Sequence, residues 1–377
     1  MTKICVFPND ALLSYYNKGE IKSGYYNPKN MFNEIHVLSL FDEEIEESKV
    51  QTMAGNAKLK IHKLEKVNLS NYKSFEKKII KIIEEIKPDI IRSYNPLVQG
   101  WLATKASKRL GIPHVVSLHT NYEQQRNFLK KEGKYFQFLK MMYASQKIEK
   151  FVLQNTDAVV CVYQFIFPYA KKMGAKNIHV IYNRVDLNEF APDCKKEFIS
   201  SKPTILSVGR LIEQKDHRYL IESIKDLDAN LLLIGDGPNH ETLLELAKSN
   251  GVSDKVQIIK RIAHEKLNGY YTACDIYAQP MKFLDGIPMP VLEAMASGLP
   301  VIMSRHDSCY SEIIDDAVVF VENDGKKFSD AFKKILSNSE YKENLKRKSL
   351  ETIKKISGEV MEQREYELYQ DLIKNKS

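Results

Sequence analysis

The sequence predicts an α/β protein made of two parallel sheets, each covered by helices. Strand-like apolar runs alternate with helical patterns along the whole chain, which is typical of right-handed βαβ units. At 377 residues the chain is long for one hydrophobic core and long enough for two domains. A polar stretch that contains Pro192 divides the alternation into two series. We therefore expect one doubly wound domain on each side of that stretch.

The first series predicts an N-terminal domain over residues 1–186. In open parallel sheets, ligands bind beyond the carboxyl ends of the strands, so the residues that follow each strand are candidates for a site. The expected helices lie near Phe75–Ile86 and Leu97–Leu110. The expected strands are Ile4–Phe7, His36–Leu40, Leu59–Leu64, Ile90–Ser93, His114–His119, Ala158–Val162 and His179–Tyr182.

Residues 187–201 form the expected linker, and the second series predicts a C-terminal domain over residues 202–357. The charged stretch Ser329–Lys376 is predicted to be helical, with residues 358–377 as the last helix. The expected helices before it are Asp216–Lys225, Glu241–Asn250 and Val291–Ser297. The expected strands are Thr204–Val208, Leu231–Ile234, Val256–Ile259, Ile276–Ala278, Val301–Met303 and Val318–Val321.

Composition excludes several classes of protein. The net charge is +7, from 56 Lys and Arg against 49 Asp and Glu, which is too small a bias to indicate nucleic-acid binding. No apolar run approaches the ~18 residues that a membrane span needs, and the N-terminus turns polar too early for a signal peptide. The five cysteines are scattered and odd in number, which favours free thiols in a reducing cytosol.

The stretch FLDGIPMPVLEAMASGLPVIMSR contains the strongest local signal. Its loop, Gly286–Met289, leads into a short helix with Pro290 expected at the first helical position and Gly298 at the end. The free N–H groups and the dipole of such a helix N-terminus bind anions. Asp285 lies ahead of the loop, and Glu293 is expected in the first helical turn. Because carboxylates repel phosphate, we expect these two to accept hydrogen bonds from sugar hydroxyls.

Two cations follow the first strand of the second series. In SVGRLIEQKD, Gly209 and Arg210 come directly after the strand, and Lys215 lies five residues further on. Arginine donates bidentate hydrogen bonds and lysine acts as a point charge, so the pair suits a diphosphate. Gly235 and Gly237 follow the next strand, where glycine allows a tight turn and close approach of the backbone.

Other chemistries lack their motifs. The chain has no Gly-x-x-x-x-Gly-Lys phosphate-binding loop and no Gly-x-Ser-x-Gly sequence. Its nine histidines form no His-Glu-x-x-His motif and no paired Cys–His cluster. We therefore expect no metal site.

Together these residues resemble the donor-site signature of the retaining glycosyltransferases of family 4. The matching residues of its Glu-Ala-Met-Ala-x-Gly-x-Pro-Val part are Glu293, Ala294, Met295, Ala296, Gly298, Pro300 and Val301. Its Val-Gly-Arg-Leu, followed by a lysine, is matched by Val208, Gly209, Arg210, Leu211 and Lys215. The resemblance implies the GT-B fold, in which two doubly wound Rossmann-like domains face each other across a cleft. In related proteins the last helix crosses back to the first domain.

The resemblance also implies a reaction, the transfer of a sugar from a nucleotide diphosphate sugar such as a UDP- or GDP-sugar to an acceptor hydroxyl. It implies retention of configuration, with no metal and no cofactor. Arg210 and Lys215 would hold the diphosphate and stabilise its charge as it leaves. Glu293 would bind the ribose, and Asp285 and His119 would contact the donor sugar. The other donor-binding residues that it implies are Gly209, Gly235, Gly237, Arg261, Gly286, Ile287, Met289, Pro290 and Val291.

The chain departs from the family pattern at several positions. Asp285 stands where the family usually has Glu, Pro288 stands where it often has Gly, and tyrosines replace a Gly-rich turn after the first strand. Arg261 fits a residue that stacks on the base and equally an exposed arginine, and His119 alone also fits a structural role. The alternatives to transfer are a nucleotide-sugar-binding protein without activity and a nucleotide-sugar 2-epimerase.

The segment Lys130–Lys150 interleaves lysines with Phe, Leu, Met and Tyr. This pattern fits a basic amphipathic helix that lies on an acidic membrane, and equally a solvated helix packed on its own sheet. We expect the acceptor to be a glycan, a glycolipid or a small molecule used in surface glycan or glycolipid synthesis. The protein is then expected to be cytoplasmic, or peripheral at the inner face of the membrane.

Overall fold

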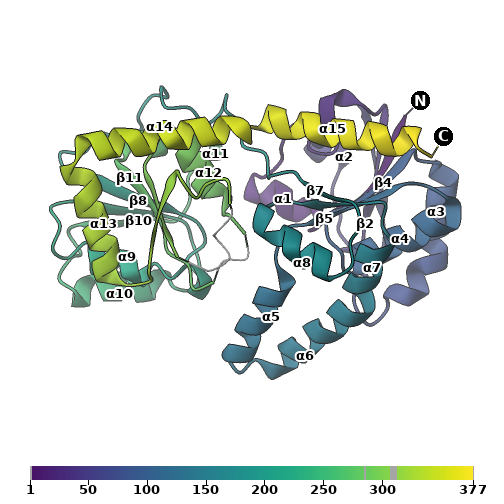
Figure 1. Ribbon diagram of the computed structural model, residues 1–377, viewed down its shortest axis with the longest axis horizontal. Helices are drawn as coiled ribbons and strands as arrows, with labels where there is room; N and C mark the ends of the chain where they lie inside the picture. Colours follow the sequence, from purple (N-terminus) through teal and green to yellow (C-terminus); the bar gives the residue numbers. More distant parts are fainter. Residues whose placement is uncertain (1, 284–285, 306–311, 377) are drawn as a thin grey trace. The chain divides into compact units, whose positions relative to one another are not determined.

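The structure is a computed structural model that describes residues 2–283, 286–305 and 312–376. It divides into two compact units, the first made of Met1–Tyr182 with Val360–Ser377 and the second of Asn183–Glu359. Each unit is a parallel β-sheet with helices packed around it (Figure 1). The predicted class of two doubly wound α/β domains is confirmed. Residues 187–201, the expected linker, belong to the second unit.

The first unit contains a seven-stranded parallel sheet with the order β3-β2-β1-β4-β5-β6-β7. Its strands are β1 (Lys3–Phe7), β2 (Glu34–Ser39), β3 (Lys58–Lys63), β4 (Ile90–Ser93), β5 (His114–Leu118), β6 (Ala158–Cys161) and β7 (Ile178–Val180). In the central register Ile4 pairs with Ile35 on one side and Ile90 on the other. All seven strands overlap predicted runs. The central strands β4, β5 and β6 are buried along their whole length, as expected for strands covered on both faces, whereas the edge strand β3 alternates lysines with apolar residues.

The helices of the first unit differ from prediction mainly in the segment Lys130–Lys150. There the chain is not one helix, because Gly133 adopts a left-handed φ of 68° and a π-helical turn, Ser145–Glu149, follows the next helix. The helices are α1 (Leu12–Lys18), α2 (Glu47–Val50), α3 (Glu76–Ile86), α4 (Val98–Leu110), α5 (Tyr122–Lys131), α6 (Tyr135–Ala144), α7 (Lys150–Asn155), α8 (Phe167–Lys172) and α15 (Gly358–Lys374). None of the helices among the described residues is both long enough and apolar enough to cross a membrane.

The second unit contains a six-stranded parallel sheet with the order β10-β9-β8-β11-β12-β13. Its strands are β8 (Thr204–Val208), β9 (Asn230–Ile234), β10 (Val256–Ile259), β11 (Ile276–Gln279), β12 (Val301–Ser304) and β13 (Val318–Val321). Its helices are α9 (Arg218–Ser223), α10 (His240–Ser249), α11 (His264–Ala273), α12 (Met289–Ala296), α13 (Gly325–Ser337) and α14 (Ser339–Lys355). The connections leave β8 and β11 in opposite directions, so this sheet has its topological switch point between those two strands.

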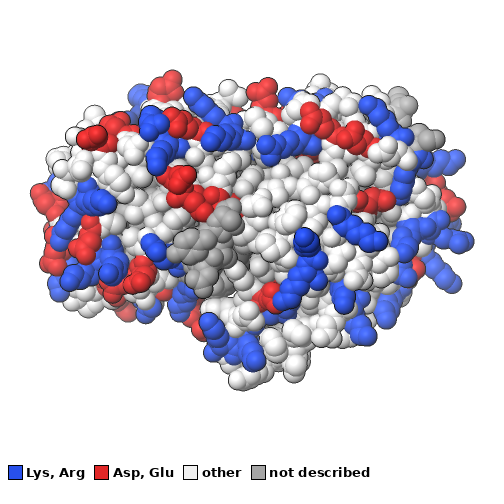
Figure 2. Space-filling model, in the orientation of Figure 1, with Lys and Arg blue, Asp and Glu red and all other residues white. Residues whose placement is uncertain are grey.

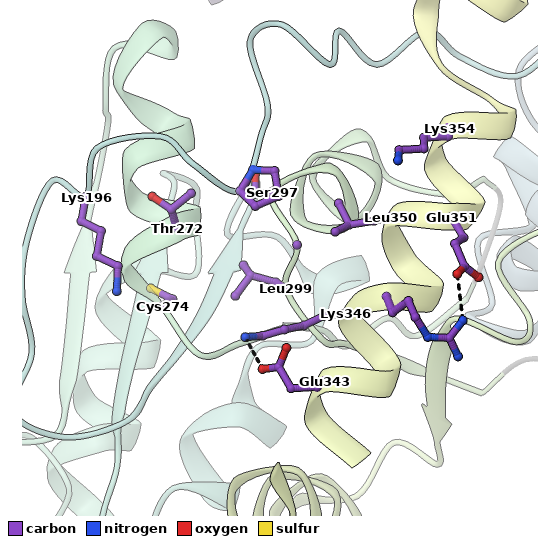
Figure 3. Close-up of a pocket in the computed structure, with 13 residues that line it drawn as sticks. Lys196, Thr272, Cys274, Ser297, Leu299, Glu343, Lys346, Leu350, Glu351 and Lys354 are labelled. Carbon is purple, nitrogen blue, oxygen red and sulfur yellow. Dashed lines mark hydrogen bonds and ion pairs between the residues drawn. The ribbon is translucent and has the colours of Figure 1, made fainter. Parts of the chain in front are cut away.

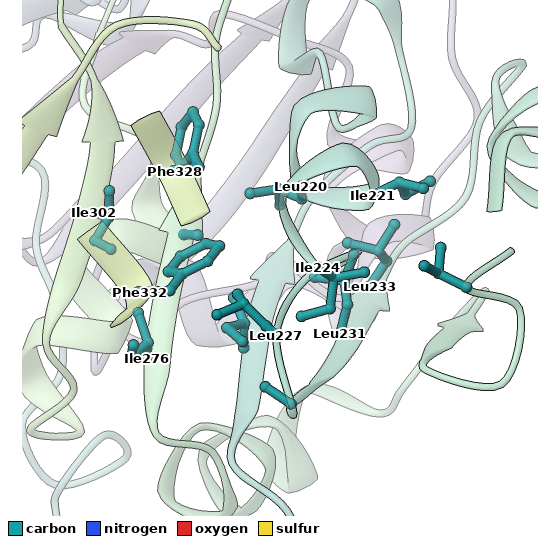
Figure 4. Close-up of a cluster of buried hydrophobic side chains, with 14 of the residues drawn as sticks. Leu220, Ile221, Ile224, Leu227, Leu231, Leu233, Ile276, Ile302, Phe328 and Phe332 are labelled. Carbon is teal, nitrogen blue, oxygen red and sulfur yellow. The ribbon is translucent and has the colours of Figure 1, made fainter. Parts of the chain in front are cut away.

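Alternate residues of the central strands build the core on one face of this sheet. Leu231 and Leu233 of β9, with Ile276 of β11, are fully or almost fully buried there. They pack with α9 and with Phe328 and Phe332 of α13 (Figure 4). The period of two between Leu231 and Leu233 is the one expected when successive side chains point to opposite faces.

The charged C-terminal stretch is helical as predicted, but it is divided into α13, α14 and α15. Asn338 breaks the first two helices apart with an extended backbone, and its side chain accepts a hydrogen bond from the Tyr341 N–H at 2.8 Å. This is an N-cap, which satisfies a donor that the helix itself cannot. The expected helix Asp216–Lys225 is shorter for a related reason, because Asp216 adopts a left-handed φ of 42°.

Candidate functional site

The carboxyl edge of the second sheet brings together most of the predicted donor-site residues. Gly209 and Arg210 follow β8, Met281–Phe283 follow β11, and α12 lies between β11 and β12. Because β8 and β11 are neighbours at the topological switch point, their loops leave the same edge of the sheet side by side. This is the place where a doubly wound sheet binds a ligand.

The two predicted cations lie in the loop after β8. The Arg210 side chain is exposed, and Lys215 is half-buried at the end of a 3-10 turn, Glu213–Lys215. The loop after β11 is joined to this turn by Lys282, whose N–H donates to the Gln214 carbonyl oxygen at 2.8 Å and whose Nζ lies 2.7 Å from Glu213 Oε1. Lys282 is therefore a third cation at this edge. The sequence motifs did not include it, although a lysine three residues after a strand at the switch point is a usable signal.

The glycines of the Gly235-Asp236-Gly237 turn are required by packing between two loops. Their φ angles are 153° and 159°, and a Cβ would overlap the carbonyl oxygen of Gly209 at the first position and that of Leu211 at the second. A hydrogen bond from the Leu211 N–H to the Asp236 carbonyl oxygen, 2.9 Å, joins the same loops. In contrast, a Cβ on Gly209 would meet no described atom within 4 Å, so the backbone there is accessible to a ligand.

Helix α12 begins one residue earlier than predicted, with Pro288 as its N-cap and Pro290 as the second helical residue. The Val291 N–H donates to the Pro288 carbonyl oxygen at 2.9 Å. Since Pro290 has no N–H, the Met289 N–H is the group that this N-terminus can offer to an anion. Gly298, with a φ of 76°, lies just beyond the helix end, as predicted.

Glu293 lies in the second turn of α12 rather than the first, and only 6% of its surface is exposed. The hydroxyl of Tyr271, in α11, donates to Glu293 Oε2 at 2.9 Å. Burial, and then the adjacent Glu293 carboxylate, raise the pKa of Tyr271 well above its usual value, so the phenol remains a donor. A buried carboxylate held in this way is suited to accept a hydrogen bond from a ligand hydroxyl. No sequence motif pointed to Tyr271.

The remaining predicted donor-binding residues differ in what they can offer. The side chains of Ile287 and Val291 are buried in the core, so only their main chain can reach a ligand. Gly286, Met289 and Pro290 are half-buried, and Arg261 is exposed after β10. Asp285 lies outside the described residues. Within the described ranges, no three His, Cys, Asp or Glu side chains are grouped so that they could hold a metal ion.

His119 belongs to the first unit and follows β5 directly. Its ring stacks on Tyr94, with centroids 6.2 Å apart and planes 28° from parallel. Its Nε2 is buried and has no hydrogen-bond partner in the described part of the chain. Burial, and to a smaller extent the positive charge of Arg92, lower the pKa of His119 to about 4. The imidazole is therefore neutral at pH 7 and leaves one ring nitrogen for a ligand.

An aromatic and ionic cluster supports His119. Tyr25 stacks on Tyr94 with centroids 5.3 Å apart, and the Arg92 guanidinium lies 4.7 Å from the centroid of the Tyr94 ring. Arg92 is buried in β4, and its Nε lies 3.4 Å from Glu365 Oε1 in α15. The tyrosines that replace a Gly-rich turn in the sequence thus include one that builds this edge of the first sheet.

A cavity of about 640 Å³ in the second unit lies away from these residues, at the C-terminal end of α12. Two ion pairs belong to its wall, Lys346–Glu343 and Arg347–Glu351, each 2.8 Å long (Figure 3). Its lining comprises Pro192, Lys196, Thr272, Cys274, Ser297, Gly298, Leu299, Glu343, Lys346, Arg347, Leu350, Glu351 and Lys354. No residue predicted to bind the donor lines it.

Two Rossmann-like units, with cations, a helix N-terminus and a buried carboxylate at the switch point of the second, define a protein of the GT-B class. Residues 33–189 match the family model described as Glycosyltransferase Family 4, and residues 192–352 match the model described as Glycosyl transferases group 1. The chain belongs to glycosyltransferase family 4, as the sequence resemblance predicted.

Relatives and solved structures agree with this assignment. An uncharacterized glycosyltransferase of Methanocaldococcus jannaschii is 26% identical over 284 residues, which cover 74% of each chain. The UDP-Gal:alpha-D-GlcNAc-diphosphoundecaprenol alpha-1,3-galactosyltransferase of Escherichia coli is 26% identical over 278 residues, which cover 68% of each. The structure of sucrose-phosphate synthase from Thermosynechococcus elongatus superposes over 100% of both chains, with a TM-score of 0.78 and 16% identity. The last comparison confirms the fold.

Proposed function

We propose that the protein transfers a sugar from a nucleotide diphosphate sugar, such as a UDP- or GDP-sugar, to an acceptor hydroxyl with retention of configuration. One observation carries the proposal, the grouping of unlike polar groups at the carboxyl edge of β8 and β11. Cations there suit a diphosphate, and the buried carboxylate of Glu293 suits the ribose hydroxyls. A nucleoside diphosphate has both a diphosphate for the cations and ribose hydroxyls for the carboxylate, so it fits this combination of groups.

The cations would also act on the reaction rate. Negative charge develops on the diphosphate as the bond to the sugar breaks, and a group that binds this charge stabilises the transition state more than the ground state. We assign this role to Arg210 and Lys215, with Lys282 holding the loop of Lys215 in place through Gln214 and Glu213. The Met289 N–H would contribute a further donor to the diphosphate. With these groups present, the reaction would need no metal.

His119 and Asp285 would hold the donor sugar. A pKa of about 4 keeps the His119 imidazole neutral at pH 7, so it would orient a sugar hydroxyl by hydrogen bonding and would not protonate the leaving group. A double displacement needs a carboxylate nucleophile beneath the anomeric carbon. Glu293 is assigned to the ribose and Asp285 to sugar hydroxyls, so we propose that the diphosphate leaves first and takes the acceptor's proton on the same face.

We place the reaction in the synthesis of a surface glycan or glycolipid, with a glycan, a glycolipid or a related small molecule as acceptor. The name of the E. coli relative gives UDP-Gal as its donor and a diphosphoundecaprenol-linked GlcNAc as its acceptor. A reaction of that kind would take place in the cytoplasm or at the inner face of the membrane.

The test begins with thermal shifts of the protein against a panel of UDP-, GDP- and other nucleotide sugars. The donor that stabilises the protein is then incubated with and without acceptors, and the products are identified by mass spectrometry and proton NMR. We expect release of the nucleoside diphosphate, a product with the donor's anomeric configuration, and no sugar adduct on the protein. An inverted product would contradict retention. Binding without turnover would indicate a binding protein, and a donor changed at C2 would indicate an epimerase.

A further inference from the structure

Helix α6 presents an apolar face that the rest of the described chain leaves largely uncovered. Tyr135, Phe136, Leu139 and Tyr143 are 61%, 82%, 63% and 50% exposed. An α-helix turns by roughly 100° per residue, so these four positions fall within an arc of about 100° and form one stripe. Four of the eight large hydrophobic side chains that are exposed in the described residues therefore lie on one ten-residue helix.

The opposite face of α6 is also apolar, and it packs inward. Phe138, Met141 and Met142 are half-buried, and Ala144 is buried. A helix that only covers its own domain has a polar outer face, because that face meets water. Helix α6 departs from this pattern, and an exposed stripe of aromatic and aliphatic side chains marks an interaction surface.

Lysines surround the stripe. Between residues 127 and 148 the charged side chains are five lysines and one glutamate, a net charge of 5 − 1 = +4, in a chain whose total is +7. All six are exposed, namely Lys130, Lys131, Glu132, Lys134, Lys140 and Lys147. In Figure 2, blue side chains flank an uncharged tip at the lower end of the view, where Figure 1 draws α5 and α6.

The base of the α5–α6 hairpin is fixed to the first unit. Arg126 of α5 is buried, and its Nη1 lies 3.5 Å from Glu149 Oε2 in the π-helical turn after α6. The Tyr169 hydroxyl of α8 donates to Glu149 Oε1 at 2.5 Å. A buried and hydrogen-bonded ion pair at the base holds the hairpin in one orientation, so the exposed stripe is presented at a fixed place on the unit.

We propose that α6 docks on the surface of an anionic lipid bilayer. Its four exposed apolar side chains would enter the headgroup region, and the surrounding lysines would lie against the lipid phosphates with their aliphatic stems along the apolar boundary. Charge complementarity favours this partner over a protein, because lysine is depleted in protein–protein interfaces whereas aromatic residues and lysine together are typical of helices at bilayer surfaces. The inference stands apart from the proposed transfer reaction.

The experiment is sedimentation with vesicles of phosphatidylcholine, alone or mixed with phosphatidylglycerol. We expect the protein to bind the mixed vesicles, and to bind them less as salt is added. Phe136→Ser should weaken the partition by about tenfold, the effect of one large apolar side chain that leaves the interface. Ile199→Ser is the matched control, because Ile199 is 93% exposed in the second unit, and it should change nothing.

A second pair of variants tests the charge. Lys140→Glu should weaken the partition into phosphatidylglycerol vesicles by about fivefold or more. Lys81→Glu, which makes the same change of charge at an exposed position of α3, should leave it unchanged. Equal effects within either pair, or no binding to the mixed vesicles, would overturn the proposal. A dimer that Phe136→Ser converts to a monomer would overturn it in favour of a second copy. Donor binding, measured separately by thermal shift, shows whether a failure here also affects the proposed function.

Discussion

The first six strands of the first unit follow the same order as the six strands of the second, but the two units build different kinds of site on this shared topology. In the second unit, the loops at the carboxyl edge present cations and a helix N-terminus near a buried carboxylate. In the first unit, the equivalent edge holds a stack of Tyr25, Tyr94 and His119 over the buried Arg92–Glu365 ion pair. One edge is suited to binding a charged group. The other offers aromatic faces and a neutral imidazole, which suit sugars and less polar groups.

This difference explains why the sequence described one edge so much better than the other. In the second unit, Arg210 and Lys215 follow a strand and Glu293 lies in a short helix, so local motifs such as SVGRLIEQKD contain each of them. In the first unit, the cluster is assembled from segments as far apart as Tyr25 and Glu365, and no local pattern joins them. The comparison can be tested by removing one group from each edge.

The largest effect is expected from Glu365→Ala, which leaves Arg92 as a buried charge without its carboxylate. We expect a loss of about 3–5 kcal/mol in the free energy of unfolding, the range for breaking a buried ion pair at one end. The Tyr369 hydroxyl, which donates to Glu365 Oε1 at 2.6 Å, loses its acceptor as well. Urea unfolding followed by circular dichroism measures this loss.

The control for that variant is Glu367→Ala, an exposed carboxylate two residues further along α15. Its effect should stay within about 0.5 kcal/mol. If the free energy of unfolding decreases by the same amount in both variants, the buried ion pair is not what stabilises this edge of the first sheet.

In the second unit, Arg210→Ala and Lys215→Ala should act on catalysis and leave stability almost unchanged, because Arg210 is exposed and Lys215 is half-buried. Each is expected to lower kcat by about 10²–10³-fold, the range for removing one donor that stabilises developing charge. Lys248→Ala, at an exposed position of α10, is the control. Steady-state kinetics in which only KM changes would contradict the role in leaving-group stabilisation.

The fold was predictable almost strand by strand, because most strands are apolar runs between polar turns and the edge strand β3, KLKIHK, still alternates apolar and polar residues. The helices were less predictable where a single residue decides a boundary. Asn338 caps α14 with its own side chain, and Asp216 starts α9 late by adopting a left-handed φ. Such choices depend on local hydrogen bonds that the hydrophobic period does not report.

The residues of the candidate site also include some that the sequence could place and some that it could not. Arg210, Lys215 and Glu293 could be placed from the sequence because they occur at fixed distances from strand or helix ends. Tyr271 could not, since its contact with Glu293 joins two helices and leaves no local pattern. Gly235 and Gly237 were predicted for the approach of a ligand, and the structure supplies a reason within the protein, the packing of their loop on Gly209 and Leu211.

A smaller effect is expected from Glu293→Ala. The variant removes the carboxylate assigned to the ribose, and donor affinity should fall by about 1.5–3 kcal/mol, the range for a hydrogen bond to a charged group. Isothermal titration calorimetry with the nucleoside diphosphate measures the change. Tyr271→Phe keeps Glu293 but removes the donor that holds it, so it should weaken binding less. Unchanged affinity in a folded Glu293→Ala protein would remove Glu293 from the donor site.

The smallest effect concerns pH, and it compares one histidine from each unit. Burial, and then Lys215, lower the pKa of His217 to about 4, just as burial and Arg92 do for His119. The usual histidine pKa is about 6.5, so between pH 6.5 and 4 the unfolded chain binds more protons than the folded one, and stability must fall as the pH falls through this window. His217 is only 2% exposed, and its protonation in the unfolded state alone should cost about 1.4 kcal/mol at pH 5.5. His217→Gln cannot bind that proton, so its unfolding free energy should decrease less than that of the natural protein between pH 7.5 and pH 5.5.

A second variant extends the comparison to both units. If the two units unfold in separate transitions, His217→Gln should flatten the pH dependence of the unfolding free energy of one unit, and His119→Gln should flatten that of the other. Identical pH dependence in the natural protein and in both variants would mean that neither histidine is held neutral by burial.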